Sequence, residues 1–288
     1  AFQAAVTEKT RAIFVESLAN PGGVIVDLEA IAKIAQEAEG PLIVDNTMAT
    51  PWLCRPFEWG ADLVVHSTTK FLSGQGNAMG GIVIDSGRFP WFGNAKYPSL
   101  SEPCPDYNGL TFAETFGDMA FTLYSHAVSL RDLGCTQSPM NAWITLNGVE
   151  TLPLRMERHV ENAQKVAGFL QQHPSVEWVS YAGLSSSPYY QLAQKYLQGK
   201  AGSVFTFGIR GGYESGLRLL EKVELFSHVS NIGDSRSLIL HPASTTHRQL
   251  SDEQRLTAGA GPEVIRLSVG IESAEDLIAD LEQALEGL

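Results

Sequence analysis

The sequence has few cysteines, few basic residues relative to acidic ones and no long apolar run, and each absence excludes a class of protein. Its three cysteines, Cys54, Cys104 and Cys135, lack the paired spacing of a zinc site or a disulfide framework. Lysine and arginine number 20 against 32 aspartates and glutamates, so the net charge of −12 argues against binding to nucleic acid or an anionic membrane. No apolar run approaches the roughly 20 residues of a membrane span. We therefore expect a cytoplasmic protein.

The first half of the sequence alternates between short apolar runs and amphipathic stretches, a pattern typical of an α/β protein. The length of 288 residues allows one large or two ordinary domains. A helix is expected from residue 28 to 39, capped by Asp27 and closed by Gly40. Strands are expected at residues 11–15, 42–45, 63–65 and 81–84, which together predict a mainly parallel sheet.

Two of these expected strands end in residues that carry chemistry. The run 63–65 leads into Ser67, Thr69 and Lys70, and the run 42–45 ends in Asp45. Ligands of open α/β sheets bind beyond the carboxyl ends of the strands, so these side chains are candidates for one site. The alternative is a solvated loop with a surface lysine. A lysine and a carboxylate at neighbouring strand ends, with hydroxyls between, are the equipment of a pyridoxal phosphate (PLP) site.

The glycines of residues 74–81 resemble a dinucleotide fingerprint only superficially. They lead into an expected strand, whereas that fingerprint leads from a strand into a helix. A tight return loop beside Lys70 explains them more simply. Residues 88–117 are rich in Pro, Gly and aromatic residues without a period, which is typical of a functional segment or of an insertion that packs on a partner.

The second half of the sequence predicts a different organisation. A long amphipathic helix from residue 154 to 173 is expected to connect two domains, residues 1–150 and 151–288, with the boundary near Thr151. Strands are expected at 176–181, 204–209, 238–240 and 264–269, and helices at 212–223 and 274–285. These elements predict a smaller α+β domain.

Arg266 is the charged residue of the apolar run 264–269. A guanidinium in that place is either half of a structural ion pair or a two-pronged clamp for a substrate carboxylate, and its position leaves both open. His241 and His247 lie in a loop of small polar residues, but no third ligand is evident nearby, so no metal site is expected.

Taken together, five motifs resemble the Cys/Met-metabolism family of PLP-dependent enzymes, in order and over nearly the whole chain. They are Glu16-Ser17 with Asn20-Pro21, Val44-Asp45-Asn46-Thr47, His66-Ser67-Thr68-Thr69-Lys70-Phe71, His241-Pro242-Ala243-Ser244 with Thr246-His247, and Arg266-Leu267-Ser268-Val269-Gly270-Ile271-Glu272. The resemblance implies the aspartate aminotransferase-like (type I) α/β fold, with a mainly parallel PLP-binding domain and a smaller α+β C-terminal domain.

The resemblance also implies a role for each matching residue. Lys70 corresponds to the Schiff-base lysine and proton shuttle, and Asp45 to the partner of the pyridinium nitrogen. The cofactor phosphate is expected on Ser67 and Thr69. The other implied contacts are the phenolic oxygen of the cofactor with Asn20, and the substrate carboxylate with Ser237 and Arg266, beside Asn20.

Within the family, residues 231–238 and 246–250, together with the aromatic-rich segment, look more like O-acetylhomoserine sulfhydrylases than cystathionine synthases or lyases. The implied reaction is γ-replacement on O-acetyl-L-homoserine by sulfide or a thiol, giving homocysteine or methionine in a homotetramer built from dimers. The alternatives are a cystathionine γ-synthase, a cystathionine or methionine γ-lyase, and a cofactor-free fragment or scaffold.

One departure from the family accompanies these matches. Family members have an upstream segment that adds a backbone turn on the phosphate, an aromatic ring over the cofactor, and a tyrosine and an arginine that reach the neighbouring subunit. We therefore expect this chain to be the C-terminal part of a longer enzyme, and to bind PLP weakly or not at all when alone.

Overall fold

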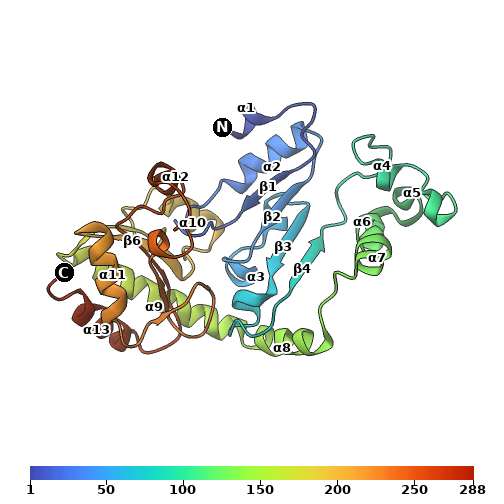
Figure 1. Cartoon of the computed structure of the whole chain (residues 1–288). Coiled ribbons are helices and arrows are strands. Elements are labelled where there is room, and N and C mark those ends of the chain that lie inside the picture. Colours follow the sequence, from blue (N-terminus) through green and yellow to red (C-terminus); the bar gives the residue numbers. More distant parts are fainter.

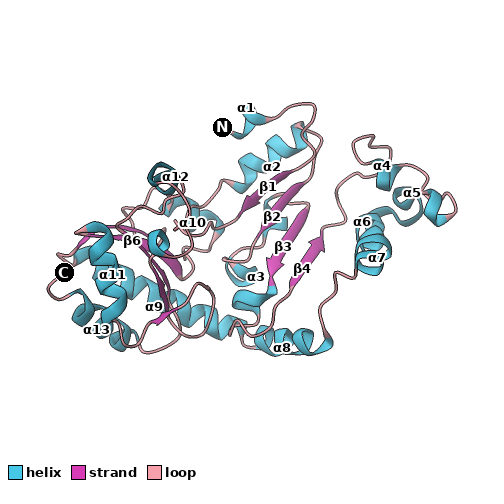
Figure 2. Ribbon diagram, viewed as in Figure 1, coloured by secondary structure: helices cyan, strands magenta, loops and turns pink.

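The structure, a computed structural model, describes residues 1–288 and contains two β-sheets with helices packed on them (Figures 1 and 2). The first sheet has the strand order β1-β2-β3-β4. Strands β1, β2 and β3 run parallel, and β4 pairs antiparallel with β3. The strands are β1 (Ile13–Glu16), β2 (Leu42–Asp45), β3 (Leu63–Ser67) and β4 (Gly81–Asp85), so the expected mainly parallel sheet is confirmed.

Helix α2 (Leu28–Glu37) lies along one face of this sheet (Figure 1). It begins as expected at Asp27, whose carboxylate accepts a hydrogen bond from the N–H of Ala30 at 3.2 Å. Its Ile31 and Ala35 are buried in the main apolar core. The other helical segments near this sheet are α1 (Phe2–Ala5), α3 (Thr50–Leu53), η1 (Pro56–Trp59), η2 (Thr68–Leu72) and α8 (Pro139–Glu150).

The aromatic-rich segment after β4 folds on itself. In Figure 1 its helices α4 to α7 lie beyond β4, on the side away from the second sheet. Its side chains form a separate small apolar cluster of Trp91, Leu100, Phe112, Ala113 and Ala120. The segment contains α4 (Pro98–Ser101), η3 (Pro105–Tyr107), α5 (Phe112–Phe116), η4 (Gly117–Met119), α6 (Ala120–Tyr124), η5 (Ser125–Leu130) and α7 (Arg131–Leu133).

The second sheet has five strands in the order β5-β6-β9-β8-β7. Its pairs are antiparallel except for β7 with β8. The four longer strands occupy the runs expected from the sequence, and β7 was not expected. The strands are β5 (Val176–Ser180), β6 (Val204–Ile209), β7 (Ser227–His228), β8 (Leu238–Leu240) and β9 (Val264–Ser268).

Helix α9 (Leu152–Gln172) runs from the region of the first sheet to the second (Figure 1). The expected boundary at residue 150 falls just before it, and the division into two domains stays a prediction. One apolar core includes residues from both sheets. The remaining helices are α10 (Tyr190–Tyr196), α11 (Gly212–Lys222), η6 (Pro242–Ser244), α12 (Asp252–Thr257) and α13 (Ala274–Leu285). None of the helices combines the length and the apolar character needed to cross a membrane.

Candidate cofactor site

Asp45 and Ser67 are the last residues of two adjacent parallel strands, β2 and β3. Thr47 connects them. The N–H of Thr47 donates to Oδ1 of Asp45 at 2.9 Å, and the N–H of Ser67 donates to Oγ1 of Thr47 at 2.8 Å. Thr47 was not among the residues predicted for the site, although it follows Asp45 in the motif that carries the family resemblance.

Lys70 lies in the short helical segment η2, immediately after β3. Its backbone leaves the helical region, with φ −90° and ψ −126°, so the segment kinks at this residue. The half-buried amine donates a hydrogen bond of 2.5 Å to Oδ1 of Asn231, and it forms no ion pair. Burial, together with the positive charge of Arg266, lowers the pKa of Lys70 below its usual value of 10.5.

Arg266, on β9, lies on the other side of Asn231. Its Nη2 donates to the main-chain oxygen of Asn231 at 3.1 Å, and its Nη1 lies 3.4 Å from Oδ1 of Asn20. No carboxylate lies within ion-pair distance of Arg266, in contrast to eight pairs elsewhere in the chain. Of the two interpretations left open by the sequence, the structural ion pair is therefore excluded, and the guanidinium is free to bind a carboxylate.

Asn20 connects Arg266 to the first sheet. Its N–H donates to Oε2 of Glu16 at 3.1 Å, and Glu16 is the cross-strand neighbour of Asp45. Burial, and to a lesser extent the charge of Asp45, raise the pKa of Glu16, while the bond from Asn20 opposes the shift. Hydrogen bonds therefore link Lys70 through Asn231, Arg266 and Asn20 to Glu16, which pairs with Asp45 in the sheet.

The two hydroxyls predicted for the cofactor phosphate differ in their surroundings. The hydroxyl of Ser67 has no hydrogen-bond partner within the chain. That of Thr69 donates to the carbonyl oxygen of Gly80 at 3.3 Å and accepts from the N–H of Gly80 at 3.1 Å. Thr69 thus holds the glycine-rich return loop against η2, as expected for a loop beside Lys70.

Ser237, expected on the substrate carboxylate, makes its hydrogen bonds within the chain. It is fully buried, and its hydroxyl donates to Oε2 of Glu272 at 2.9 Å and accepts from the N–H of Gly270 at 2.8 Å. Its own N–H donates to Oε1 of Glu272 at 2.7 Å. The contact of Ser237 with the substrate carboxylate therefore stays a prediction, and it would require this side chain to exchange its internal bonds for bonds to the substrate.

His241 is likewise buried and satisfied. Its Nε2 lies 2.9 Å from the main-chain oxygen of Pro262, and its Nδ1 lies 3.0 Å from the hydroxyl of Ser244. The first contact requires a proton on Nε2, so Nδ1 accepts from Ser244. These bonds hold the turn η6 against the segment that leads into β9.

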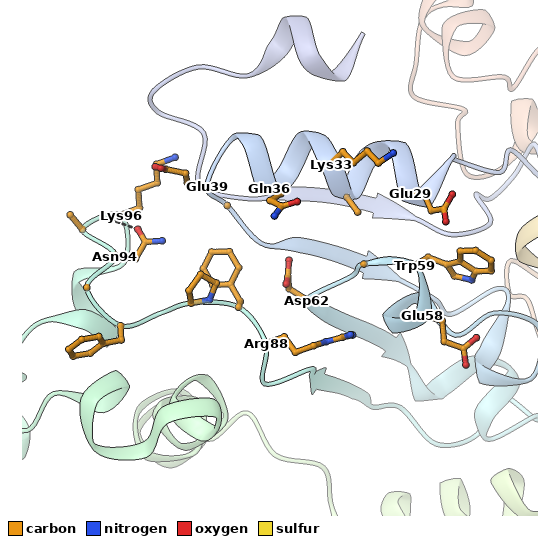
Figure 3. A pocket seen from close by; sticks show the side chains of 18 residues that line it. Glu29, Lys33, Gln36, Glu39, Glu58, Trp59, Asp62, Arg88, Asn94 and Lys96 are labelled. Atoms are coloured by element: carbon orange, nitrogen blue, oxygen red, sulfur yellow. Dashed lines mark hydrogen bonds between the residues drawn. The ribbon is translucent and has the colours of Figure 1, made fainter.

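A wide cavity lies elsewhere in the chain. It has a volume of about 910 Å³ and opens between α2 and the segment 88–96 (Figure 3). Asp62 and Arg88 point into it, and Asp62 immediately precedes β3, at the end of the sheet opposite Ser67. Asp62 is already bonded to the N–H of Leu42 at 2.8 Å. The cavity therefore does not include Lys70 or its neighbours.

The residues gathered around Lys70 fit PLP. The amine has no counter-ion and a lowered pKa, so more of it is the neutral, nucleophilic form than for an exposed lysine. Asp45 presents a carboxylate at the adjacent strand end, and Ser67 offers an unused hydroxyl. Arg266 supplies a desolvated cation with no anionic partner.

Residues 1–286 match the sequence model of the Cys/Met metabolism PLP-dependent enzymes. The chain belongs to this family. It is 49% identical to an O-acetyl-L-homoserine sulfhydrylase of Leptospira meyeri, over 100% of this chain and 67% of the relative. It is 50% identical to O-acetyl-L-homoserine sulfhydrylase 1 of Thermus thermophilus, over 99% and 68%. The chain spans about two thirds of the length of these relatives.

A solved structure gives the same result for the fold. The crystal structure of a putative O-acetylhomoserine (thiol)-lyase from Campylobacter jejuni superposes with a TM-score of 0.95 at 43% identity, over 99% of this chain and 68% of that one. The lysine of that protein carries a pyridoxyl phosphate group. The expected family, the α/β fold of a PLP-dependent enzyme and the cofactor are thereby confirmed.

Proposed function

We propose that this chain forms the main part of the site of a PLP-dependent transferase that replaces the acetate of O-acetyl-L-homoserine with sulfide or a thiol. The observation that carries the proposal is that Lys70 and Arg266 both donate hydrogen bonds to Asn231. Both are partly buried cations, and neither has a carboxylate partner. Burying such cations is costly unless a ligand uses them. The names of the similar sulfhydrylases support the choice of substrate.

In this proposal Lys70 forms the covalent link to the cofactor, and Asp45 keeps the pyridine nitrogen protonated. Ser67, with Thr69 beside it, holds the phosphate, and Asn20 contacts the phenolic oxygen. The hydrogen bond that Asp45 accepts from the N–H of Thr47 fixes the carboxylate at the end of β2. PLP supplies a protonated ring that accepts the electrons of a broken bond at Cα of the substrate.

The chain's own residues then orient the substrate and move its protons. Arg266 binds the substrate carboxylate with its two-pronged guanidinium. Lys70 would move the substrate's protons one at a time: its lowered pKa makes the free amine available to take the proton of Cα, and it would give up that proton before it takes one from Cβ. Acetate leaves from Cγ, sulfide or a thiol adds there, and Lys70 returns the protons. The products are acetate and homocysteine, or methionine when the thiol is methanethiol.

The proposal extends to the assembly and the compartment. We infer a cytoplasmic homotetramer built from dimers. Each chain would consist of a cofactor domain (residues 1–150) and a small domain (residues 151–288). The sequence resemblance supports this arrangement.

The test is an absorbance spectrum of the chain after addition of PLP and gel filtration. If the chain retains PLP on its own, we expect a visible band of lysine-bound cofactor in the wild type and in Lys96→Ala, and its loss in Lys70→Ala. Absence of the band from all three proteins is the result expected if the isolated chain binds PLP too weakly to retain it. Lys96 is a suitable control because it is also half-buried and hydrogen-bonded. A band that persists in Lys70→Ala contradicts the assignment of Lys70.

The substrate is tested by product analysis with O-acetylhomoserine plus sulfide, compared with O-acetylhomoserine plus cysteine and with cystathionine alone. We expect homocysteine from the first mixture. Cystathionine from the second mixture, or cleavage of cystathionine in the third, identifies instead a cystathionine γ-synthase or a γ-lyase.

A further inference from the structure

Asn231 joins the two cations of the candidate site. It lies in the loop between β7 and β8, and two of its atoms make separate contacts. Its side-chain oxygen accepts the hydrogen bond from Nζ of Lys70 at 2.5 Å, while its main-chain oxygen accepts one from Arg266 at 3.1 Å. One residue thus fixes the amine of Lys70 relative to the guanidinium of Arg266.

The orientation of the Asn231 side chain is itself fixed by the glycine-rich loop that follows η2. Gly76 has φ +63°, and a Cβ atom at that position would lie 2.5 Å from Nδ2 of Asn231. The loop can approach the amide only because this residue is glycine. Ser235 fastens the two loops together, since its N–H and hydroxyl donate to the main-chain oxygen of Gly74 at 2.8 and 2.9 Å.

The chemistry of the amide also suits a lysine that must move protons. A neutral oxygen accepts a hydrogen bond from either form of the amine without the strong preference for the ammonium form that a carboxylate would impose. Aspartate would fill the same space as Asn231. The presence of an amide here therefore orients the amine without raising its pKa as a negative charge would.

The other charged groups around η2 make no hydrogen bond to the amine of Lys70, so the contact with Asn231 is the one that positions it. Arg155, from α9, donates to the main-chain oxygen of Phe71 at 2.8 Å. His159, also from α9, packs against the ring of Phe71, and burial lowers its pKa to about 4, so it is neutral at pH 7. Asp234 is paired with Arg236 at 3.0 Å. Arg266 is the charged group that acts on Lys70.

We propose that Asn231 is a positioning residue whose amide oxygen holds the free amine of Lys70, as a neutral acceptor, beside the carboxylate-binding Arg266. This inference rests on the proposed function for the role of Lys70. Asn231 does not react with the substrate itself, and it acts through the lysine.

The test uses the whole chain without PLP, so that it does not depend on cofactor binding. Labelling of lysine amines by trinitrobenzenesulfonate is followed from pH 6 to 11, and peptide mass mapping reports Lys70 separately. Asn231→Asp preserves the shape and adds a charge, so the midpoint for Lys70 should rise by about one pH unit or more. Asn231→Ala removes the acceptor of the ammonium, so the midpoint should fall. Lys96 in the same digests is the internal control.

A second pair of variants leaves Asn231 in place. Gly76→Ala displaces the Asn231 amide and should reproduce the midpoint of Asn231→Ala. Gly93→Ala imposes a similar backbone cost, because Gly93 has φ +68°, but its Cβ would meet no atom within 4 Å, and the midpoint for Lys70 should not change. Circular dichroism establishes that each variant is folded.

The inference is overturned if Lys70 has the same midpoint in the wild type, Asn231→Asp and Asn231→Ala, because a side chain that only fills space would give that result. It is also overturned if Gly76→Ala and Gly93→Ala have the same effect. Failure of the proposed function has a different outcome: Lys70 shows the expected shifts, but a band of lysine-bound cofactor formed with PLP persists in Lys70→Ala.

Discussion

The N–H of Ser67 donates a hydrogen bond of 2.8 Å to Oγ1 of Thr47, and this bond ties the end of β3 to the residue that follows β2. The same threonine donates its own N–H to Asp45. Asp45 and Ser67 are the residues proposed to bind opposite ends of the cofactor. Their separation therefore depends on one hydroxyl that contacts neither ring nor phosphate in the proposal.

We expect Thr47→Val to lower both the stability of the chain and its retention of PLP. Valine has the shape of threonine, but it leaves the partly buried N–H of Ser67 without an acceptor, which costs about 1–3 kcal/mol. Urea unfolding measures the first effect, and the absorbance band after gel filtration measures the second. Thr257→Val is the control, because Thr257 is exposed on helix α12 and its hydroxyl only donates to the main-chain oxygen of Glu253, so no N–H loses an acceptor. Equal losses in the two variants would contradict a special role for Thr47.

Arg266→Lys should separate substrate binding from cofactor binding. Lysine keeps the charge but loses the two-pronged geometry, and a charged hydrogen bond contributes about 1.5–3 kcal/mol. We therefore expect KM for O-acetylhomoserine to rise roughly 10- to 100-fold, with little change in PLP retention. Arg210→Lys is the control, since Arg210 is exposed and its guanidinium donates only to the main-chain oxygen of Pro174, away from the candidate site. An unchanged KM in Arg266→Lys would assign the substrate carboxylate to another residue.

Ser237→Ala distinguishes the expectation from sequence from the arrangement in the structure. Because Ser237 is buried between Glu272 and Gly270, its loss leaves polar groups without partners, and the free energy of unfolding should fall by about 1–3 kcal/mol. At temperatures where the variant is folded, KM for the substrate should remain within about twofold of the wild type. A large rise in KM without loss of stability would instead restore the original prediction of a substrate contact.

Local sequence signals were sufficient for much of the fold. The apolar runs that become β2 and β3 are bounded by polar residues, so their position and their ends could be predicted. The cap of helix α2 could also be predicted, because the side chain of Asp27 accepts a hydrogen bond from an N–H three residues later. Lys70 and Asp45 could be proposed together because Asp45 ends one expected strand and Lys70 closely follows the next.

The remaining parts of the site depend on contacts that no local pattern encodes. Lys70 and Asn231 are 161 residues apart, and they meet only because the loop before β8 packs against η2. Ser237 belongs to the same loop as Asn231, and nothing local indicates that it turns inward, since its partner Glu272 lies 35 residues away. The sequence thus located the loop but not the side chain within it that reaches the lysine.

His159 connects the site to the stability of the whole chain. It is fully buried on α9, its Nδ1–H donates to the main-chain oxygen of Val269 at 2.6 Å, and its Nε2 has no partner. Its ring packs edge-on against Phe71, the residue after Lys70, with the centroids 5.4 Å apart. Burial lowers its pKa from 6.5 to about 4, so the native protein holds this ring neutral.

We expect the chain to lose stability between pH 6.5 and pH 4 on account of this residue. The unfolded chain takes up the proton near pH 6.5, whereas the folded chain resists it until about pH 4, so the contribution is present above pH 6.5 and is lost as the pH falls. The shift corresponds to about 3 kcal/mol. His159→Asn retains a donor for Val269 and cannot titrate, so its unfolding free energy should fall less steeply with decreasing pH. Urea unfolding at several pH values measures this, with exposed His126→Asn as the control. Parallel curves for wild type and His159→Asn would exclude His159 as the cause.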